Sequence, residues 1–361
     1  MATTLTRETT RARTRPALID GDIHNDLPSP KDLLPYLPAA WREYHAQFGT
    51  FGYSATNYPR INQNAARTDA WPPNGGNPGS DLAFMREQLL DAWQIEYGIL
   101  NCLHSAGARR LDQAAAVAQA VNDWQIDAWL DPEPRLRASI VLPHEDGDLS
   151  AAEIERVAHD RRFVQALLIA RTAEPLGRRK YWPIYKAAAR NDLPVGIHFG
   201  GSGGHAFTGA GRPSYYIEDH AGMSQAIQAQ VVSLVCEGVF ERFPTLKIVL
   251  IEGGFAWLPP LMWRLDAAFR RLRAEVPHLK RPPSEYIREH FWITTQPMEE
   301  PTKPEQFHQL LDHLAMPDRL IFATDYPHWD FDAPDQAFPV RLAPALERDI
   351  LAENARRLYQ L

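Results

Sequence analysis

Short apolar runs alternate with longer stretches of helical period along almost the whole chain. The runs are four to nine residues of mostly β-branched and aliphatic side chains, and the stretches between them repeat apolar positions every three or four residues. The runs lie within residues 17–25, 95–105, 136–145, 164–172, 193–201, 246–254, 291–297 and 319–328, and residues 342–360 predict a closing helix. Nearly continuous apolar strands, each followed by a helix, are typical of a parallel sheet buried on both faces.

Eight such units in one chain predict a (β/α)8 barrel. The alternative is an open doubly wound sheet, but no strand is followed by the glycine pattern of a dinucleotide site. The sequence has no internal repeat or dividing linker, so we expect residues 1–17 to form a surface or disordered arm and 18–361 a single domain. Residues 25–80 and 200–222 are too long for simple connections, and we expect them to form lids or partner contacts.

Composition narrows the functional class. The 361 residues are 45% hydrophobic and 23% charged, with a net charge of -7 and a pI near 6.0. This charge gives no reason to expect nucleic acid or an anionic membrane as a partner. Two cysteines are too few for a disulfide framework. No segment has the roughly 20 apolar residues of a membrane span, and the Arg- and Thr-rich start lacks a signal-peptide core. We therefore expect a cytoplasmic protein that acts on a small molecule.

Polar side chains end four of the predicted strands. The first ends in Asp22-Ile23-His24, the fifth in His198, the sixth in Glu252 and the eighth in Asp325. Residues at the carboxyl ends of barrel strands meet at one mouth of the barrel, where the active sites of such barrels lie. Imidazole and carboxylate ligands without thiolate favour a divalent metal such as zinc or manganese, with iron as a third choice. Each residue alone also fits a structural role, so the prediction depends on their shared position.

Further polar and aromatic residues at the same end are candidate substrate contacts. Arg171 could clamp a carboxylate, and His328 follows Asp325 closely enough to support it. His104 and His144 follow the second and third strands, and His205 or His220 could reach inward from the long second loop. The remaining candidates are a hydrogen-bonding side chain and flat apolar walls: Gln296, Trp257, Phe199 and Trp329.

The motifs "DGDIHN", "VGIHFG", "VLIEGGFAWLP", "ITTQP" and "FATDYPHWD" together resemble the amidohydrolase superfamily. More narrowly, they resemble its amidohydrolase-related branch, which includes aminocarboxymuconate-semialdehyde and γ-resorcylate decarboxylases. The resemblance runs from about Leu18 to the C-terminus. It implies that Asp22, His24, His198 and Asp325 are metal ligands, and it implies a homodimer by analogy.

Two departures from the family pattern bear on the chemistry. The lysine that bridges two metals in binuclear members is not apparent in the fourth strand, "ALLIART", so we expect one metal ion. The sixth strand commonly ends in a histidine in this family, and here Glu252 holds that place. A carboxylate can bind metal or accept a proton but cannot act as an imidazole does, so the acid/base roles of Asp325, Glu252 and His328 stay open.

Three functions follow from these observations. The first is metal-dependent, non-oxidative decarboxylation of a small planar carboxylic acid, with Asp325 as ligand and proton shuttle. The second is metal-dependent hydrolysis of a lactone, amide or ester, which the same residues would also serve. The third, suggested by the Glu252 substitution, is a barrel without catalysis that acts as a binding protein.

Overall fold

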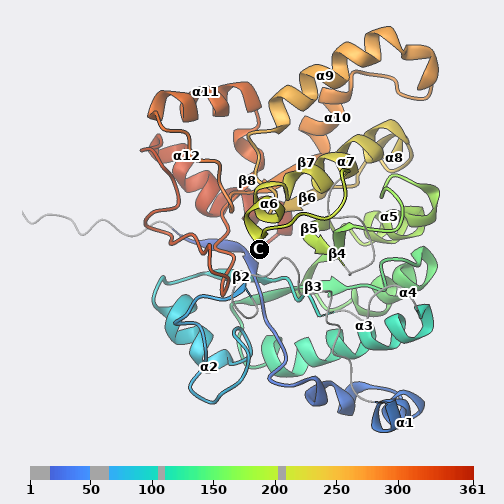
Figure 1. Ribbon diagram of the computed structural model, residues 1–361, viewed down its shortest axis with the longest axis vertical. Helices are drawn as coiled ribbons and strands as arrows, with labels where there is room; N and C mark the ends of the chain where they lie inside the picture. Colours follow the sequence, from blue (N-terminus) through green and yellow to red (C-terminus); the bar gives the residue numbers. More distant parts are fainter. Residues whose placement is uncertain (1–16, 49–64, 105–109, 202–208) are drawn as a thin grey trace, which may run out of the picture.

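Eight parallel strands form the centre of the molecule (Figure 1). The computed structural model describes residues 17–48, 65–104, 110–201 and 209–361. The strands are hydrogen-bonded in chain order, each to the next. They are β1 (Ile19–Ile23), β2 (Tyr97–Leu100), β3 (Leu136–Val141), β4 (Phe163–Arg171), β5 (Val195–Gly201), β6 (Ile248–Ile251), β7 (Phe291–Thr294) and β8 (Leu320–Ile321).

The sheet closes on itself between its first and last strands. The Gly21 N–H donates to the Phe322 carbonyl at 2.8 Å, and the His24 N–H donates to the Tyr326 carbonyl at 2.7 Å. A parallel bridge pairs Ile23 with Tyr326. Closure leaves no unpaired sheet edge. The predicted (β/α)8 barrel is confirmed.

Helices surround the strands (Figure 1). Several begin where the sequence supplies a helix start. The Asp146 carboxylate accepts from the Leu149 N–H, and five other α-helices have a proline at their first or second position. The α-helices are α1 (Ala39–Phe48), α2 (Leu82–Met85), α3 (Leu111–Gln125), α4 (Gly147–Val157), α5 (Trp182–Arg190), α6 (Tyr216–Ala221), α7 (Ser224–Cys236), α8 (Val239–Arg242), α9 (Leu258–Arg271), α10 (Pro283–His290), α11 (Pro304–Leu314), α12 (Pro344–Arg348) and α13 (Asn354–Tyr359).

Shorter turns extend several of these helices. Wider π turns continue α2 and α3 and join α12 to α13, over Arg86–Asp91, Ile126–Leu130 and Asp349–Glu353. Turns of 3-10 type cover Pro30–Tyr36, Arg179–Tyr181, Arg273–Glu275 and Pro317–Arg319. The closing helix predicted for residues 342–360 is therefore three consecutive pieces.

The apolar core has two parts. The larger one lies between the strands and the surrounding helices. The smaller one fills the barrel with side chains such as Ile19, Val164 and Ile321, and α13 packs against it through Leu358 and Tyr359. The C-terminus accordingly lies near the centre of the ring of strands in Figure 1. Because α13 covers the starts of the strands, only their carboxyl ends are left for an active site.

The two long segments are only partly described. Residues 25–80 include α1 and a 3-10 turn, and residues 49–64 lie outside the described residues, as do 202–208 of the second segment and 1–16 of the arm. The lid, interface and arm assignments therefore stay predictions. Within the described ranges, no helix is both long and apolar enough to cross a membrane.

A close backbone contact gives a prediction for stability. A Cβ on Gly177, in the loop between β4 and α5, would lie 2.2 Å from the Ser233 carbonyl oxygen of α7. Backbone atoms cannot yield as a flexible side chain can, so Gly177→Ala should lower the free energy of unfolding by about 1–3 kcal/mol. The matched control is Gly209→Ala, because a Cβ there meets no atom of the described residues within 4 Å. Equal denaturant midpoints for the two variants would contradict this prediction.

Candidate metal centre and active site

Five side chains predicted from the strand ends come together at the barrel mouth. Asp22 is in β1 and His24 follows it, His198 is in β5, and Glu252 and Asp325 follow β6 and β8. All five are at least nine-tenths buried. Glu252 and Asp325 leave their strands with φ of 53° and 59°, which is uncommon for residues other than glycine. Such backbone strain often marks functional sites, and here it turns both carboxyl groups toward the cluster.

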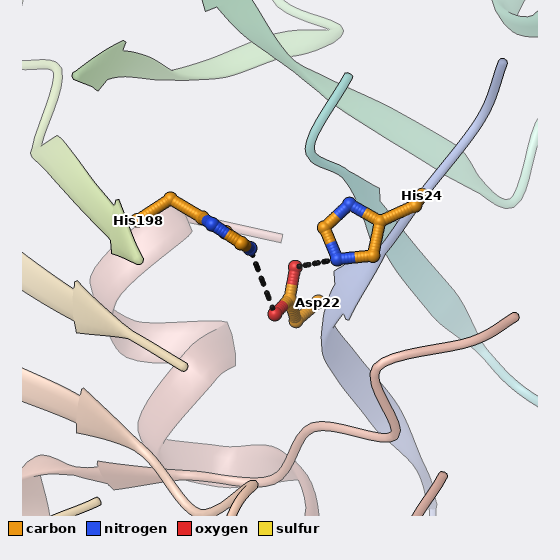
Figure 2. Close-up of side chains that lie close together, drawn as sticks. All are labelled: Asp22, His24 and His198. Carbon is orange, nitrogen blue, oxygen red and sulfur yellow. Dashed lines mark ion pairs between the residues drawn. The ribbon is translucent and has the colours of Figure 1, made fainter. Parts of the chain in front are cut away.

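Asp22 lies between the two histidines (Figure 2). Its Oδ1 is 3.4 Å from His24 Nε2, and its Oδ2 is 3.5 Å from His198 Nε2. One nitrogen or oxygen of each of the three residues lies within 4.8 Å of the others. The three side chains therefore form a compact donor set of two imidazoles and one carboxylate.

Asp325 joins this cluster from the segment after β8, which lies beside β1. Its Oδ1 lies 2.8 Å from His24 Nε2 and 2.8 Å from His328 Nδ1, and its Oδ2 accepts a hydrogen bond from Gln296 at 3.3 Å. His24, Asp325 and His328 make a second group with metal-ligand spacing. A third group consists of Glu252, Asp325 and Asp330. His24 and Asp325 each belong to two of these three groups, so they connect the groups into one cluster.

A buried polar network orients Asp22 and His24. The Nδ1 of His24 lies 2.8 Å from the Asn101 carbonyl, so this nitrogen donates and Nε2 faces the cluster. The Asn101 amide donates to Asp22 Oδ1 at 2.8 Å. The Ser139 hydroxyl and the Gln165 amide donate to the side-chain oxygen of Asn101, Oδ1, at 2.6 and 3.2 Å. Supporting hydrogen bonds of this kind fix both the tautomer and the direction of metal ligands.

Asp20 supports the site through the backbone. Its carboxylate accepts from the Asp22 N–H at 3.1 Å, and from the N–H and hydroxyl of Thr324 at 3.0 and 2.5 Å. Burial raises the pKa of Asp20 to about 7. Asp20 therefore binds the backbone of Asp22 and holds β1 against the segment that carries Asp325.

The charges of the cluster are strongly coupled. Burial opposes a charged imidazole, but Asp22 and Asp325 outweigh it and raise the pKa of His24 to about 9. Burial would raise the pKa of Asp325, but His328 and His24 hold it well below its usual range. Burial and the nearby Asp325 carboxylate raise the pKa of Glu252 well above its usual range. The site thus concentrates buried negative charge that needs cations to balance it.

The donor set fits a divalent transition metal. Asp22 Oδ2 and His198 Nε2 are buried and have no hydrogen-bond partner among the described residues. These two atoms face each other at 3.5 Å, which is too long for a good hydrogen bond, and a metal ion bound by both would satisfy them. Imidazole nitrogen and carboxylate oxygen are ligands of zinc, manganese and iron, whereas calcium prefers oxygen alone.

The predicted substrate contacts differ in how close they lie to this cluster. Gln296 donates to Asp325 and to Asp330 Oδ2, at 3.3 and 2.9 Å. The guanidinium of Arg171 is bonded to Asp219 of α6 and lies 4.6 Å above the Phe199 ring. Trp257 donates to the Gly253 carbonyl at 2.8 Å. Among the predicted substrate contacts, Gln296 therefore hydrogen-bonds directly to a residue of the His/Asp cluster, Asp325.

Two contacts hold helix α6 next to the barrel mouth, and the sequence analysis had named His220 and Trp329 among the residues that make them. His220 Nε2 lies 2.9 Å from Asp330 Oδ2, and the Trp329 indole donates to the Tyr216 hydroxyl at 3.1 Å. His205, the other histidine considered for this role, lies outside the described residues. His104 lines a cavity beside the cluster, and His144 is buried after β3.

Sequence reasoning missed the supporting residues Asn101 and Asp330. Asn101 ends the apolar run in "GILNC", and a polar residue at the end of a strand could have marked it as a site residue. Asp330 lies in an irregular segment after β8, and no local pattern separates it from an exposed loop residue.

A (β/α)8 barrel with histidine and aspartate side chains clustered at the carboxyl ends of its strands defines the class of this protein. The Amidohydrolase family model matches residues 19–361, and the chain belongs to that family. It is 28% identical over 298 residues to the γ-resorcylate decarboxylase of Polaromonas sp., covering 78% of this chain and 88% of that protein. It is 26% identical over 304 residues to a decarboxylase of Emericella nidulans, covering 76% and 83%. These homologues are decarboxylases.

Solved structures share the fold. The dihydroxybenzoic acid decarboxylase of Polaromonas sp., with bound manganese and the inhibitor 2-nitroresorcinol, superposes with a TM-score of 0.65 at 20% identity, covering 96% of this chain and 97% of that one. The 5-carboxyvanillate decarboxylase of Novosphingobium aromaticivorans, complexed with manganese and a nitrobenzoic acid, gives 0.70 at 18% identity, covering 99% and 100%. At these identities the likeness shows the fold alone.

Proposed function

We propose that this protein is a metal-dependent, non-oxidative decarboxylase of a small aromatic carboxylic acid. The observation that carries the proposal is the buried cluster of Asp22, His24, His198 and Asp325, with two donor atoms left without hydrogen-bond partners. The decarboxylases among the relatives give the reaction class. The lack of a lysine in β4 and the sequence resemblance favour this reaction over hydrolysis.

One divalent metal, manganese by preference, would be held by Asp22, His24, His198 and Asp325. Manganese is present in two solved decarboxylases of the same fold. When bound, the metal would act as a Lewis acid toward the carboxylate and neighbouring hydroxyl of the substrate. β4 ends in Arg171 and has no lysine to bridge a second metal, which supports one ion per chain.

Asp325 and His328 are the groups that we assign to proton transfer. Asp325 delivers a proton to the ring carbon that carries the carboxylate, and His328 Nδ1, 2.8 Å from Asp325 Oδ1, supplies it. The bond from that carbon to the carboxylate then breaks. Its electron pair returns to the ring, and CO₂ leaves. Asp325 is reprotonated through His328, whose side chain is less buried than Asp325.

The remaining site residues position the substrate. Glu252 Oε2 lies 3.4 Å from His198 Nε2, so this carboxyl group is placed to hold His198 or a substrate hydroxyl. Gln296 fixes Asp325 Oδ2. Phe199 and Trp257 offer flat walls for a ring. Arg171 is the candidate for a substrate carboxylate, although its bond to Asp219 also ties α6 to the barrel. We further propose a homodimer, by analogy with the family.

The deciding experiment measures turnover with and without manganese. Protein treated with a chelator and then reloaded with manganese should release CO₂ from a panel of hydroxybenzoic acids, and the chelated protein should not. The same preparations are offered lactones and esters that carry no carboxylate. Acid release from those compounds without CO₂ release would contradict decarboxylation and favour hydrolysis. No turnover of either class by reloaded protein would favour a binding protein.

A further inference from the structure

Helix α6 is anchored to two sides of the barrel mouth. Its Asp219 is bonded to Arg171 at the end of β4, and the adjacent His220 lies 2.9 Å from Asp330 Oδ2 in the segment after β8. β4 and β8 are four places apart in a closed ring of eight strands, so the two anchors come from opposite sides. Figure 1 accordingly shows α6 near the centre of the ring of strands. The helix therefore lies across the mouth.

Tyr216, the first residue of α6, is held in place by two aromatic neighbours. Its ring centroid is 5.7 Å from that of His220 and 6.2 Å from that of Trp329, and the latter two rings are 5.1 Å apart. The Trp329 indole also donates to the Tyr216 hydroxyl at 3.1 Å. The phenol is thus positioned before a ligand binds, which lowers the entropy cost of binding.

The hydroxyl of Tyr216 has a hydrogen-bond donor to spare. Among the described residues it accepts from Trp329 and donates to none, although a phenol can do both. Burial raises the pKa of Tyr216 against the effect of the Trp329 bond, and three carboxylates raise it further: Asp330, Glu252 and Asp325. The phenol therefore keeps its proton at neutral pH. Tyr216 is only partly buried, so a ligand in the mouth can reach it.

The neighbouring side of the mouth consists mainly of acceptors. Carboxyl oxygens of Glu252, Asp325 and Asp330 lie within 4.8 Å of one another. The Gln296 amide already donates to two of these acids, at 3.3 and 2.9 Å. An anionic ligand would be repelled by such a wall unless a donor faced it. Tyr216 supplies a neutral donor there, and hydrogen bonds to a charged oxygen are stronger than those between neutral groups.

We propose that Tyr216 is a substrate-binding residue whose hydroxyl donates a hydrogen bond to the carboxylate of the aromatic acid. The hydrogen bonds of Asp219 and His220 give α6 its place over the mouth, and Tyr216 is the group that the helix delivers to the substrate. This inference rests on the proposed function, because it needs the carboxylate of the acid to lie at the metal cluster.

The test removes the hydroxyl and keeps the ring. Calorimetry on manganese-loaded full-length protein measures Kd for salicylate and for salicylamide, which has nearly the same shape but no charge. In Tyr216→Phe we expect the Kd for salicylate to rise about ten- to 100-fold, because a hydrogen bond to a charged group is lost. The Kd for salicylamide should rise by a smaller factor, about two- to fivefold, because that bond joins neutral groups.

Two further variants separate this effect from damage to α6. Tyr215→Phe removes the hydroxyl of the preceding tyrosine, which is 70% exposed, and both Kd values should stay within about twofold of the wild type. Trp329→Phe removes the indole that holds Tyr216 but keeps the Tyr216 hydroxyl, so it should weaken salicylate less than Tyr216→Phe does. Manganese content should equal that of the wild type in all three variants.

The outcomes distinguish this inference from the proposed function. If Tyr216→Phe binds salicylate as the wild type does, or if it loses salicylate and salicylamide by the same factor, the inference is overturned even when CO₂ is released. An equal loss in Trp329→Phe overturns it as well. A charge-dependent loss without turnover sustains the inference and removes the decarboxylase function. If salicylate and the other hydroxybenzoic acids all fail to bind the loaded wild type, both are overturned.

Discussion

Replacing His198 by alanine should abolish metal binding by this protein. The wild type, purified without chelator, should carry close to one equivalent of manganese, zinc or iron per chain, and His198→Ala close to none. His198 is fully buried, and its Nε2 has no hydrogen-bond partner among the described residues. Removing a direct ligand should exceed the roughly 10- to 100-fold loss of affinity typical of losing a supporting group. Elemental mass spectrometry measures the content.

A buried histidine outside the site provides the matched control. His290 in α10 is also buried, and its Nδ1 lies 2.8 Å from the Leu246 carbonyl. His290→Ala should therefore lose stability but keep its metal. Metal retained by His198→Ala at the level of the wild type would refute the assigned ligand set. Two equivalents in the wild type would refute a mononuclear site.

Replacing Asp325 by asparagine should reduce kcat for decarboxylation by roughly 10²–10⁴, the usual contribution of a positioned acid. Asparagine tolerates the left-handed backbone that Asp325 adopts, with φ of 59°, so the fold should be preserved. Asparagine keeps the shape of the side chain but cannot carry and release the proton. The measurement is single-turnover release of CO₂ by protein reloaded with manganese.

Asp330→Asn is the matched control for this loss. Asp330 is another acid close to Asp325, and it accepts hydrogen bonds from Gln296 and lies 2.9 Å from His220. Its replacement should change kcat far less, because its proposed part is to hold Gln296 and α6. If both variants lost activity equally, or if Asp325→Asn lost its metal, the fall could not be assigned to proton transfer by Asp325.

The fold and the main members of the site could be predicted from the sequence. Strand periodicity gave eight buried strands, and the carboxyl ends of parallel strands must meet at one mouth, so Asp22, His24, His198, Glu252 and Asp325 were expected together. The reason is physical: alternation and burial are local properties, and the barrel turns them into shared position. The family resemblance added the expectation of a single metal.

Contacts between distant segments could not be predicted in this way. Only the closure of β1 on the segment after β8 brings the Asp20 carboxylate to Thr324. Arg171 was expected at the substrate, and its bond to Asp219 depends on where α6 packs. The hydrogen bond from Asn101 to Asp22 joins residues 79 positions apart. Local pattern carries no information about such pairs.

The sequence by itself therefore determined the class of fold, the end of the barrel where the candidate site lies, and the types of side chain that gather there. These depend on hydrophobic period and on the order of strands, which each segment encodes locally. Tertiary structure decided which oxygen or nitrogen faces the cluster, which acids are held by neighbours, and where a cavity remains. Those properties depend on hydrogen bonds between residues far apart in sequence, and they exist only when the eight strands have closed into a barrel.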